Sequence, residues 1–240
     1  MNAISILTPT RNRPNNCDRF IKSLYETTQY TGTLELLFYV DSDDPAKDIY
    51  KEIEERWQNN FWRVEFVIGE PMSVSKSWNI IAKKSLGDIM IMGNDDLVYK
   101  TVRWDSKLMA KLIELDNPYY LTWFNDGING NRHCAFPVIS REWYETLGYF
   151  SPGVFNFGYN DTWVYDIAKR VGKLNYMDEI LVEHLHFSVG KSNMDDTYAR
   201  NRSQEKGNLY RKDKEIYERT VEDRILAAEK IKERSSLVNN

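Results

Sequence analysis

The feature that most constrains the fold is a short apolar run that ends in two carboxylates. Residues 89–92 form the run, and residues 93–96 are Gly-Asn-Asp-Asp. A run of this length without polar alternation is typical of a strand that is covered on both faces, as in a parallel sheet. Ligands of open α/β sheets bind beyond the carboxyl ends of such strands, where Asp95 and Asp96 are expected. The local sequence is compatible with a site for Mg²⁺ or Mn²⁺ and equally with a polar turn.

The bulk properties of the chain exclude several classes of protein. Its 240 residues suffice for one sizeable α/β domain with a short appendage. A net charge of −4 gives no overall basic surface for nucleic acid, although a local basic groove stays possible. Cys17 and Cys134 lie far apart, which suits a reducing compartment and excludes a cysteine-based zinc site. Without a signal-peptide pattern or a run of membrane-spanning length, we expect a cytoplasmic protein.

Alternation of strand-like and helix-like segments predicts the fold class. Apolar segments at 4–7, 34–40, 64–68 and 89–92 indicate strands. Helical patterns lie between them, at 14–30, from Asp44 and Pro45 to Trp57, and from Ser73 or Ser75 to Gly87. This spacing is typical of βαβ units, so we expect an α/β protein with a mostly parallel sheet.

The pattern becomes less regular after residue 96. Further strands are predicted at 119–123, 135–139 and 179–187, and helices at 104–115, around Trp143, and at 160–171 before Gly172. A charged stretch at 204–234 has a weak apolar stripe that includes Ile216, Tyr217 and Leu226, which indicates an amphipathic helical tail packed on the domain or on a partner. The predicted division is a domain at 1–190 and a C-terminal loop with a helical extension at 191–240.

Three loops are expected to meet at one edge of the sheet. The segments 8–13, 41–44 and 93–96 each follow a predicted parallel strand, and the carboxyl ends of parallel strands share an edge. They offer hydroxyls with a guanidinium, a carboxylate, and the pair of aspartates. This combination predicts a pocket for a nucleoside diphosphate. GxGxxG and GxxxxGK[ST] patterns do not occur, which argues against dinucleotide and P-loop sites.

These segments carry a resemblance to a known family. Ile-Ser-Ile-Leu-Thr-Pro-Thr-Arg-Asn-Arg at 4–13, Tyr-Val-Asp-Ser-Asp-Asp at 39–44 and Gly-Asn-Asp-Asp at 93–96 resemble, in order and spacing, the GT-A glycosyltransferases, particularly the inverting family 2. The resemblance covers roughly residues 3 to 190. It implies a Rossmann-like, mostly parallel sheet flanked by helices. It further implies transfer of a sugar with inversion from a nucleoside-diphosphate sugar, with a UDP-sugar favoured.

The resemblance also implies where the donor binds. Asp41 is similar to the carboxylate that accepts the N–H of the base. The alternative role for Asp41 is structural, as the first residue of an Asx turn at the strand end. Loop residues Asn125, Asp126, Arg132 and His133 are candidates for contacts with the donor sugar. The expected nucleotide-sugar-binding residues are Thr8, Thr10, Arg11, Asp41, Ser75, Asn79, Asn94, Asp95 and Lys191.

The metal motif departs from the family pattern. The usual Asp-x-Asp is Gly93-Asn94-Asp95 here, so the first carboxylate is missing and Asp95 corresponds to the second. The resemblance implies a compensating histidine from the end of the fold. His184 and His186 are two apart on a predicted strand and would therefore face the same side. The expected ligands of Mn²⁺ or Mg²⁺ are Asp95, Asp96, His184 and His186.

Asp161 resembles the catalytic base of the family, and Asn160 replaces the glutamate of its Glu-Asp pair. Asp161 also suits a helix N-cap, and the two roles are compatible because a helix N-terminus keeps a carboxylate ionised. The aromatic residues between 149 and 159 are candidates for the acceptor site or for the core.

The acceptor stays open, as a glycan, a small molecule or a modified nucleic acid. One alternative is a non-catalytic nucleotide- or carbohydrate-binding protein, because Gly93 and Asn160 both replace carboxylates. Another is a phage-type glycosyltransferase that acts on modified bases in DNA. Basic residues of the tail would then contact phosphates, although a solvated helix explains them too. These residues are Arg200, Arg202, Lys206, Arg211, Lys212 and Lys214.

Overall fold

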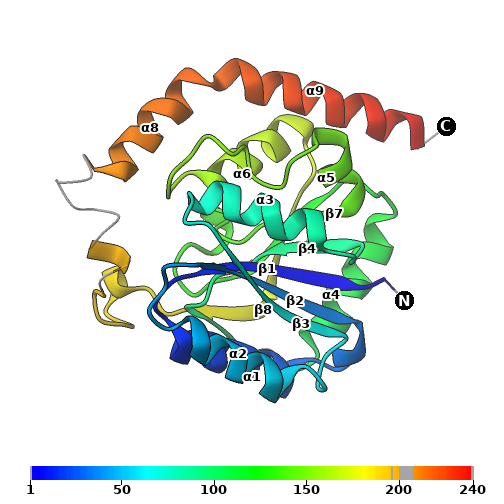
Figure 1. The fold of residues 1–240 in the computed structure, drawn as a ribbon. Coiled ribbons are helices and arrows are strands. Elements are labelled where there is room, and N and C mark those ends of the chain that lie inside the picture. Colours follow the sequence, from blue (N-terminus) through cyan, green and yellow to red (C-terminus); the bar gives the residue numbers. More distant parts are fainter. Residues whose placement is uncertain (1, 196, 200–207, 239–240) are drawn as a thin grey trace.

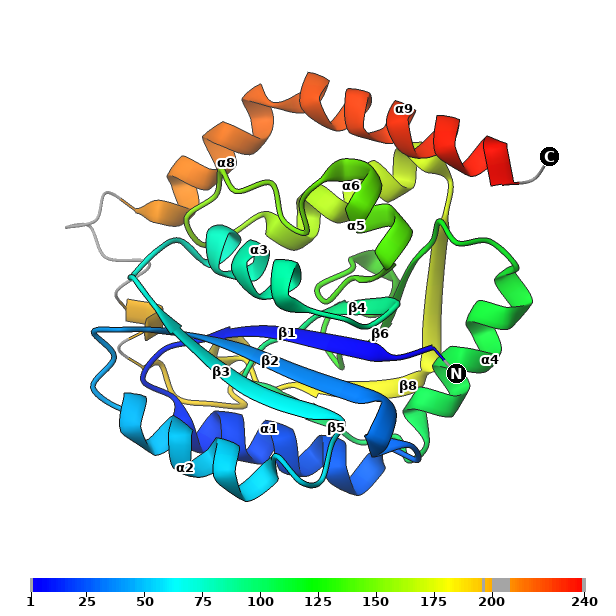
Figure 2. The same cartoon turned by 45° about the vertical axis from the view of Figure 1, so that its right-hand side comes forward.

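The computed structural model describes residues 2–195, 197–199 and 208–238. Its centre is an eight-stranded sheet with the order β3-β2-β1-β4-β7-β6-β8-β5 (Figures 1 and 2). The strands are β1 (Ile4–Thr10), β2 (Leu34–Asp41), β3 (Arg63–Gly69), β4 (Ile89–Met92), β5 (Leu97–Tyr99), β6 (Leu121–Asn125), β7 (Val138–Ser140) and β8 (Leu174–His184).

Helices cover both faces of this sheet. The α-helices are α1 (Pro14–Thr27), α2 (Lys47–Trp57), α3 (Val74–Lys84), α4 (Trp104–Leu115), α5 (Arg141–Leu147), α6 (Asn160–Val171), α8 (Leu209–Arg219) and α9 (Val221–Val238). Short 3-10 helices are η1 (Thr31–Thr33), η2 (Gly130–Arg132) and η3 (Phe187–Val189). Helices α1 and α2 lie on one face, α3, α5 and α6 lie on the other, and α8 and α9 run over the latter layer (Figure 1). In the described part of the chain, no helix combines the length and apolarity that a bilayer crossing requires.

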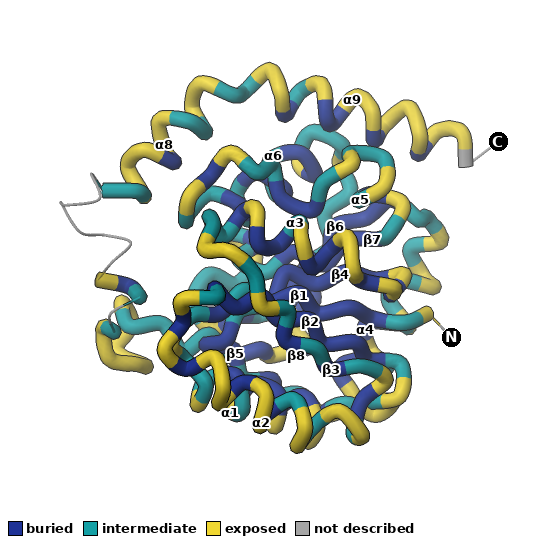
Figure 3. Tube along the Cα trace, in the orientation of Figure 1, coloured by how far each residue is buried: buried dark blue, intermediate teal, exposed yellow. Residues whose placement is uncertain are grey.

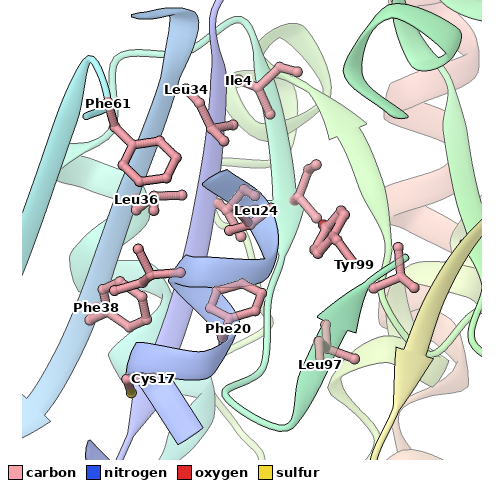
Figure 4. Close-up of a cluster of buried hydrophobic side chains, with 14 of the residues drawn as sticks. Ile4, Cys17, Phe20, Leu24, Leu34, Leu36, Phe38, Phe61, Leu97 and Tyr99 are labelled. Carbon is pink, nitrogen blue, oxygen red and sulfur yellow. The ribbon is translucent and has the colours of Figure 1, made fainter. Parts of the chain in front are cut away.

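The first half of the sheet is parallel, as expected. Strand β1 pairs in parallel with β2 and β4, and β2 pairs in parallel with β3. Alternate residues of β2 enter opposite core clusters, because side chains alternate between the faces of a strand. Leu36 and Phe38 pack beneath α1 against Phe20 and Leu24 (Figure 4), whereas Leu37 joins the cluster under α3, α5 and α6. Burial on both faces explains the continuous apolar runs of these strands.

The second half of the sheet is mixed. Strand β7 is antiparallel to β4 and β6, whereas β6 is parallel to β8. Strand β5, which the sequence pattern did not indicate, is antiparallel to β8, with Leu97 opposite His184. This register brings the end of β8 beside the residues that follow β4. It is therefore the sheet, and not the sequence spacing, that joins His184 to the carboxylate pair.

The expectation that His184 and His186 share a strand face is wrong. Strand β8 ends at His184, because the Leu185 amide donates to the Asp96 carbonyl at 2.9 Å and the chain then turns. His186 caps η3, where its Nδ1 accepts the Ser188 amide at 3.2 Å. The rings are nevertheless close, with centroids 5.0 Å apart.

Several helix ends also differ from the sequence pattern. Helix α2 begins at Lys47 and not at Pro45, because the Asp44 carboxylate accepts the Ala46 amide and holds a turn ahead of the helix. Helix α3 ends at Lys84 and not at Gly87, since Ser85 is already extended. Helix α6 has Tyr159 at its N-cap position, so the predicted capping role of Asp161 is wrong.

The C-terminal tail forms two helices that pack back on the domain. Helix α9 lies on α6 through the small residues Ala227 and Ala228, and its buried side faces the domain in Figure 3. Arg224 pairs with Asp166 at 2.7 Å. Leu226 was expected in the apolar stripe but is 56% exposed. The tail residues Arg200, Arg202 and Lys206 lie outside the described residues.

Truncation of Leu36 tests the parallel core. We expect Leu36→Ala to lower the free energy of unfolding by about 2–5 kcal/mol, because Leu36 is fully buried between β2 and α1. Leu226→Ala is the matched control, and its exposed side chain predicts a loss below about 0.5 kcal/mol. Urea unfolding of both variants measures the difference, and equal losses would contradict this packing.

Candidate active site

A cavity of about 640 Å³ opens at the carboxyl edge of the parallel strands. The loops after β1, β2 and β4 line it together with residues from the second half of the chain. The convergence expected from the sequence is thus present in the structure. The predicted site residues that line this cavity are Thr10, Arg11, Asp41, Asn94, Asp95, His133, Asp161, His184 and His186.

One end of the cavity has a carboxylate paired with a guanidinium. Arg11 donates to Asp41 Oδ2 at 2.7 Å and also binds Asp43. Burial raises the pKa of Asp41, and the contact with Arg11 opposes this effect. Tyr39 and Trp78 supply aromatic surface beside the pair. A flat, hydrogen-bonding ligand such as a nucleobase fits this combination of aromatic and charged groups.

The centre of the cavity is formed by Asp95 and its partners. Thr10 Oγ1 donates to Asp95 Oδ2 at 2.7 Å, and an Arg13 terminal nitrogen lies 3.1 Å from Asp95 Oδ1. Burial raises the pKa of Asp95 to about 6, and Arg13 opposes the rise. Arg13 also binds the Asp195 carboxylate at 2.7 and 2.9 Å. Arg13 was not among the predicted site residues, although it lies in the segment 8–13, the first of the three loops that were expected to form the pocket.

Asp96 lies behind the cavity lining, in contact with two residues that do line it, Tyr198 and His184. Its Oδ2 accepts the Tyr198 hydroxyl at 2.6 Å and lies 3.3 Å from His184 Nε2. Burial alone would raise the pKa of Asp96, but His184 and Tyr198 lower it. Within the described residues, Asp96 Oδ1 and His184 Nδ1 are buried without a hydrogen-bond partner.

Gly93 stands at the position of the missing first carboxylate, and neighbouring atoms of β1 fill the space that a side chain would need there. A Cβ added to Gly93 would lie 2.3 Å from Thr8 Oγ1 and 2.8 Å from Ile6 Cγ2. A side chain fits there only if the side chains of Thr8 and Ile6 shift. Thr8 is buried beneath this glycine and does not line the cavity.

The remaining groups fit a divalent cation that a ligand helps to hold. Among the described residues, no cluster of three or more His, Cys, Asp or Glu side chains forms a complete metal site. Mg²⁺ at phosphate sites needs only one or two carboxylates, because phosphate oxygens and water complete its shell. Asp95, His184 and His186 line the cavity together. The unpartnered atoms of Asp96 and His184 provide the oxygen and nitrogen donors that such a cation accepts.

The cavity lining also contains Asp161, in the first turn of α6. His133 Nε2 lies 2.9 Å from Asp161 Oδ2, and this hydrogen bond raises the pKa of His133. The neighbouring Asn160 accepts from Ser151 Oγ at 2.6 Å and donates to the carbonyls of Phe157 and Gly158. Asn160 therefore braces the preceding loop, at the position where the family pattern has a glutamate.

Other predicted residues lie outside the cavity lining, and their contact with a donor stays a prediction. Ser75 Oγ is 2.7 Å from Ser151 Oγ, and Asn79 binds the amides of Phe150 and Ser151. Both residues thus hold the aromatic segment that leads to α6. Lys191 pairs with Glu183 at 2.9 Å.

The loop after β6 binds mostly to itself. Asp126 accepts the amides of Ile128 and Asn129, and Arg132 donates to two carbonyls of the same loop. Asn125 donates to Asp178. Of the four loop candidates, only His133 is among the residues that line the cavity.

Solved structures with a similar fold include complexes with nucleotide sugars or nucleotides. The mannosyltransferase PcManGT from Pyrobaculum calidifontis, in complex with GDP-Man and Mn²⁺, matches with a TM-score of 0.62 and 15% identity over 77% of this chain. S. aureus TarS 1-349 in complex with UDP-GlcNAc matches with a TM-score of 0.61 and 12% identity over 75%. GalNAc-T7 with UDP, GalNAc and Mn²⁺ matches with a TM-score of 0.59 and 16% identity over 78%. The alignments cover 57%, 57% and 43% of these three chains.

The family follows from the sequence itself. The model of glycosyl transferase family 2 matches residues 5–168. This chain therefore belongs to glycosyl transferase family 2. No curated protein matches the sequence.

The contact between His133 and Asp161 makes a pH-dependent prediction. The pKa of His133 is raised in the folded protein, so the contact stabilises the fold fully below the unfolded value of about 6.5. The stabilisation is lost as pH rises through the folded pKa. We expect Asp161→Asn to lower the pKa of His133 and to flatten this part of the stability profile. NMR titration of the His133 ring measures the shift, and an unchanged pKa would refute the contact.

Proposed function

We propose that the chain transfers a sugar from a nucleoside-diphosphate sugar, with a UDP-sugar favoured, to an acceptor hydroxyl with inversion. The observation that carries the proposal is that Asp41, Asp95 and Asp161 line one cavity at the carboxyl edge of the sheet. Family membership supports it. The complexes of PcManGT with GDP-Man and of TarS with UDP-GlcNAc add support for a nucleotide-sugar donor.

In the proposed complex, different charged groups of the cavity lining would contact different parts of the donor. Asp41 and Arg11 would bind the base at one end. Arg13 and Asn94, beside Asp95, would contact the diphosphate, since a guanidinium offers two parallel donors to phosphate oxygens. The sugar would then lie between Asp95 and Asp161.

Asp161 is the proposed general base. Its carboxylate would take the proton of the acceptor hydroxyl, whose oxygen attacks the anomeric carbon as the bond to the diphosphate oxygen breaks. A single displacement of this kind inverts the configuration at that carbon. His133 would orient the carboxylate through its 2.9 Å hydrogen bond.

A divalent cation, Mn²⁺ or Mg²⁺, is part of the proposal. Asp95 with His184 or His186 would hold it, and Asp96 is an alternative ligand. The cation would supply charge that stabilises the leaving diphosphate. Lys191 is one of the expected nucleotide-sugar-binding residues. To contact the leaving diphosphate, it would first have to break its ion pair with Glu183.

The described tail does not favour a DNA acceptor. Arg211 pairs with Glu215 at 3.2 Å and Lys214 with Glu218 at 3.7 Å on the same helix. Such pairs are typical of a solvated helix and leave little net charge for a phosphate backbone.

Asp161→Asn is expected to retain donor affinity and to lower transfer at least about 100-fold, because the amide cannot take a proton. Release of nucleoside diphosphate in the presence of an acceptor panel measures transfer, and calorimetry measures donor affinity. Asp48→Asn, in the exposed first turn of α2, is the matched control. Full transfer by Asp161→Asn would exclude this residue as the base.

Chelation tests the cation. We expect EDTA to weaken donor binding and Mn²⁺ to restore it, whereas Asp95→Asn should abolish the response to Mn²⁺. A thermal-shift screen of nucleotide sugars with and without Mn²⁺ measures both effects. Donor binding that is indifferent to EDTA would contradict the proposed ligand set.

A further inference from the structure

A buried carboxylate of α8 holds the loop that leads to Asp161. Asp213 is fully buried. Its Oδ1 accepts the Asn156 amide at 2.9 Å and Asn156 Nδ2 at 3.1 Å. Its Oδ2 accepts the amides of Phe157 at 2.7 Å and Gly158 at 2.9 Å. Three consecutive backbone amides of one loop therefore converge on a side chain that lies more than fifty residues away in the sequence.

This contact fixes the conformation of the loop. A buried charge is tolerated only where hydrogen bonds replace water, and here four N–H groups do so. Tyr210 of the same helix also packs against the loop, since a Cβ on Gly158 would lie 2.9 Å from the Tyr210 ring. The next residue, Tyr159, has a left-handed backbone with φ of 65°, which the surrounding contacts must maintain.

The loop and α8 together present an aromatic wall. The ring centroid of Tyr159 lies 5.2 Å from that of Tyr210 and 5.2 Å from that of Tyr217. Tyr159 and Tyr210 line the cavity that contains Asp161, and Tyr210 is 46% exposed. The wall therefore lies beside the proposed base and is open to a ligand.

We propose that α8 builds the acceptor subsite, with Asp213 as a positioning residue and Tyr159 and Tyr210 as a platform for the ring face of an acceptor sugar. A sugar ring has a C–H face that packs on an aromatic ring and a hydroxyl rim that reaches polar groups. The base, Asp161, lies within the same cavity to receive a hydroxyl proton. The inference rests on the proposed transfer and names its acceptor class. Helix α8 lies beyond residues 5–168, which the family model matches, so Tyr210 and Asp213 come from outside the matched region while Tyr159 lies within it.

The test measures donor and acceptor separately. Full-length protein is first titrated with UDP-sugars in the presence of Mn²⁺, and nucleoside-diphosphate release is then measured against a panel of free mono- and disaccharides and duplex DNA. We expect at least one sugar to accelerate release with saturation. Tyr210→Ala should raise the KM for that sugar about tenfold, with donor affinity unchanged, and Tyr210→Phe should retain the wild-type KM.

Asp213→Asn tests the positioning role. The amide would direct N–H groups at loop amides, so the KM for the sugar should rise at least tenfold while donor affinity stays within twofold. Glu218→Gln, on the exposed side of the same helix, is the control and should match the wild type. A thermal unfolding scan shows that each variant is folded, and if Asp213→Asn does not fold, Tyr210→Ala decides the proposal.

The outcomes separate this inference from the proposed function. Failure to bind any donor would overturn both. Donor binding with release that only DNA accelerates, or that no sugar accelerates, would overturn the sugar subsite alone. A sugar KM that Tyr210→Ala leaves unchanged would also overturn it.

Discussion

The burial of Asp95 at the end of β4 is the constraint on which the site depends. A carboxylate that is 2% exposed must be compensated within the protein, and Thr10 and Arg13 of the first loop do this. Thr10 ends β1, the strand next to β4, and Arg13 follows in the loop after it, so the parallel register of β1 and β4 places both partners beside Asp95. Arg13 is in turn held by Asp195, from the segment after β8. The centre of the cavity thus connects three distant parts of the chain.

The rigid and the adaptable parts of the site come from different kinds of structure. Strands β1, β2 and β4 are packed on both faces, and their ends are therefore fixed relative to one another. The proposed acceptor side, around Asp161, is not formed by the ends of these strands. Its conformation depends on hydrogen bonds to the loop that precedes α6. Asn160 braces that loop from within, and Asp213 holds it from α8. The proposed donor site is thus built on strand ends and the proposed acceptor side on loops, which vary more readily than the scaffold that positions them.

Much of the donor side was predictable because it is local in sequence. Each of the three loops follows its strand directly, and parallel pairing then places Arg11, Asp41 and Asp95 at one edge. His184 and His186 were predicted on one face of a strand. Both line the cavity, but only His184 belongs to a strand. The register between β5 and β8 brings His184 beside Asp96, and a turn brings His186 to the cavity. Strand β5 is only three residues long, too short for its periodicity to be recognised.

The sequence alone determined the α/β class, the parallel half of the sheet, the family resemblance and the loss of the first metal-motif carboxylate. Each of these can be recognised from short continuous segments of the chain. Only the tertiary structure decided that Asp96 binds Tyr198, that Arg13 compensates Asp95, and that Asp213 holds the loop before Asp161. Each of these depends on groups 55 to 102 residues apart, with Asp96 and Tyr198 the most distant pair. Hydrogen bonds and ion pairs act over a few ångströms whatever the sequence separation, so their partners are chosen by the packing of the whole chain.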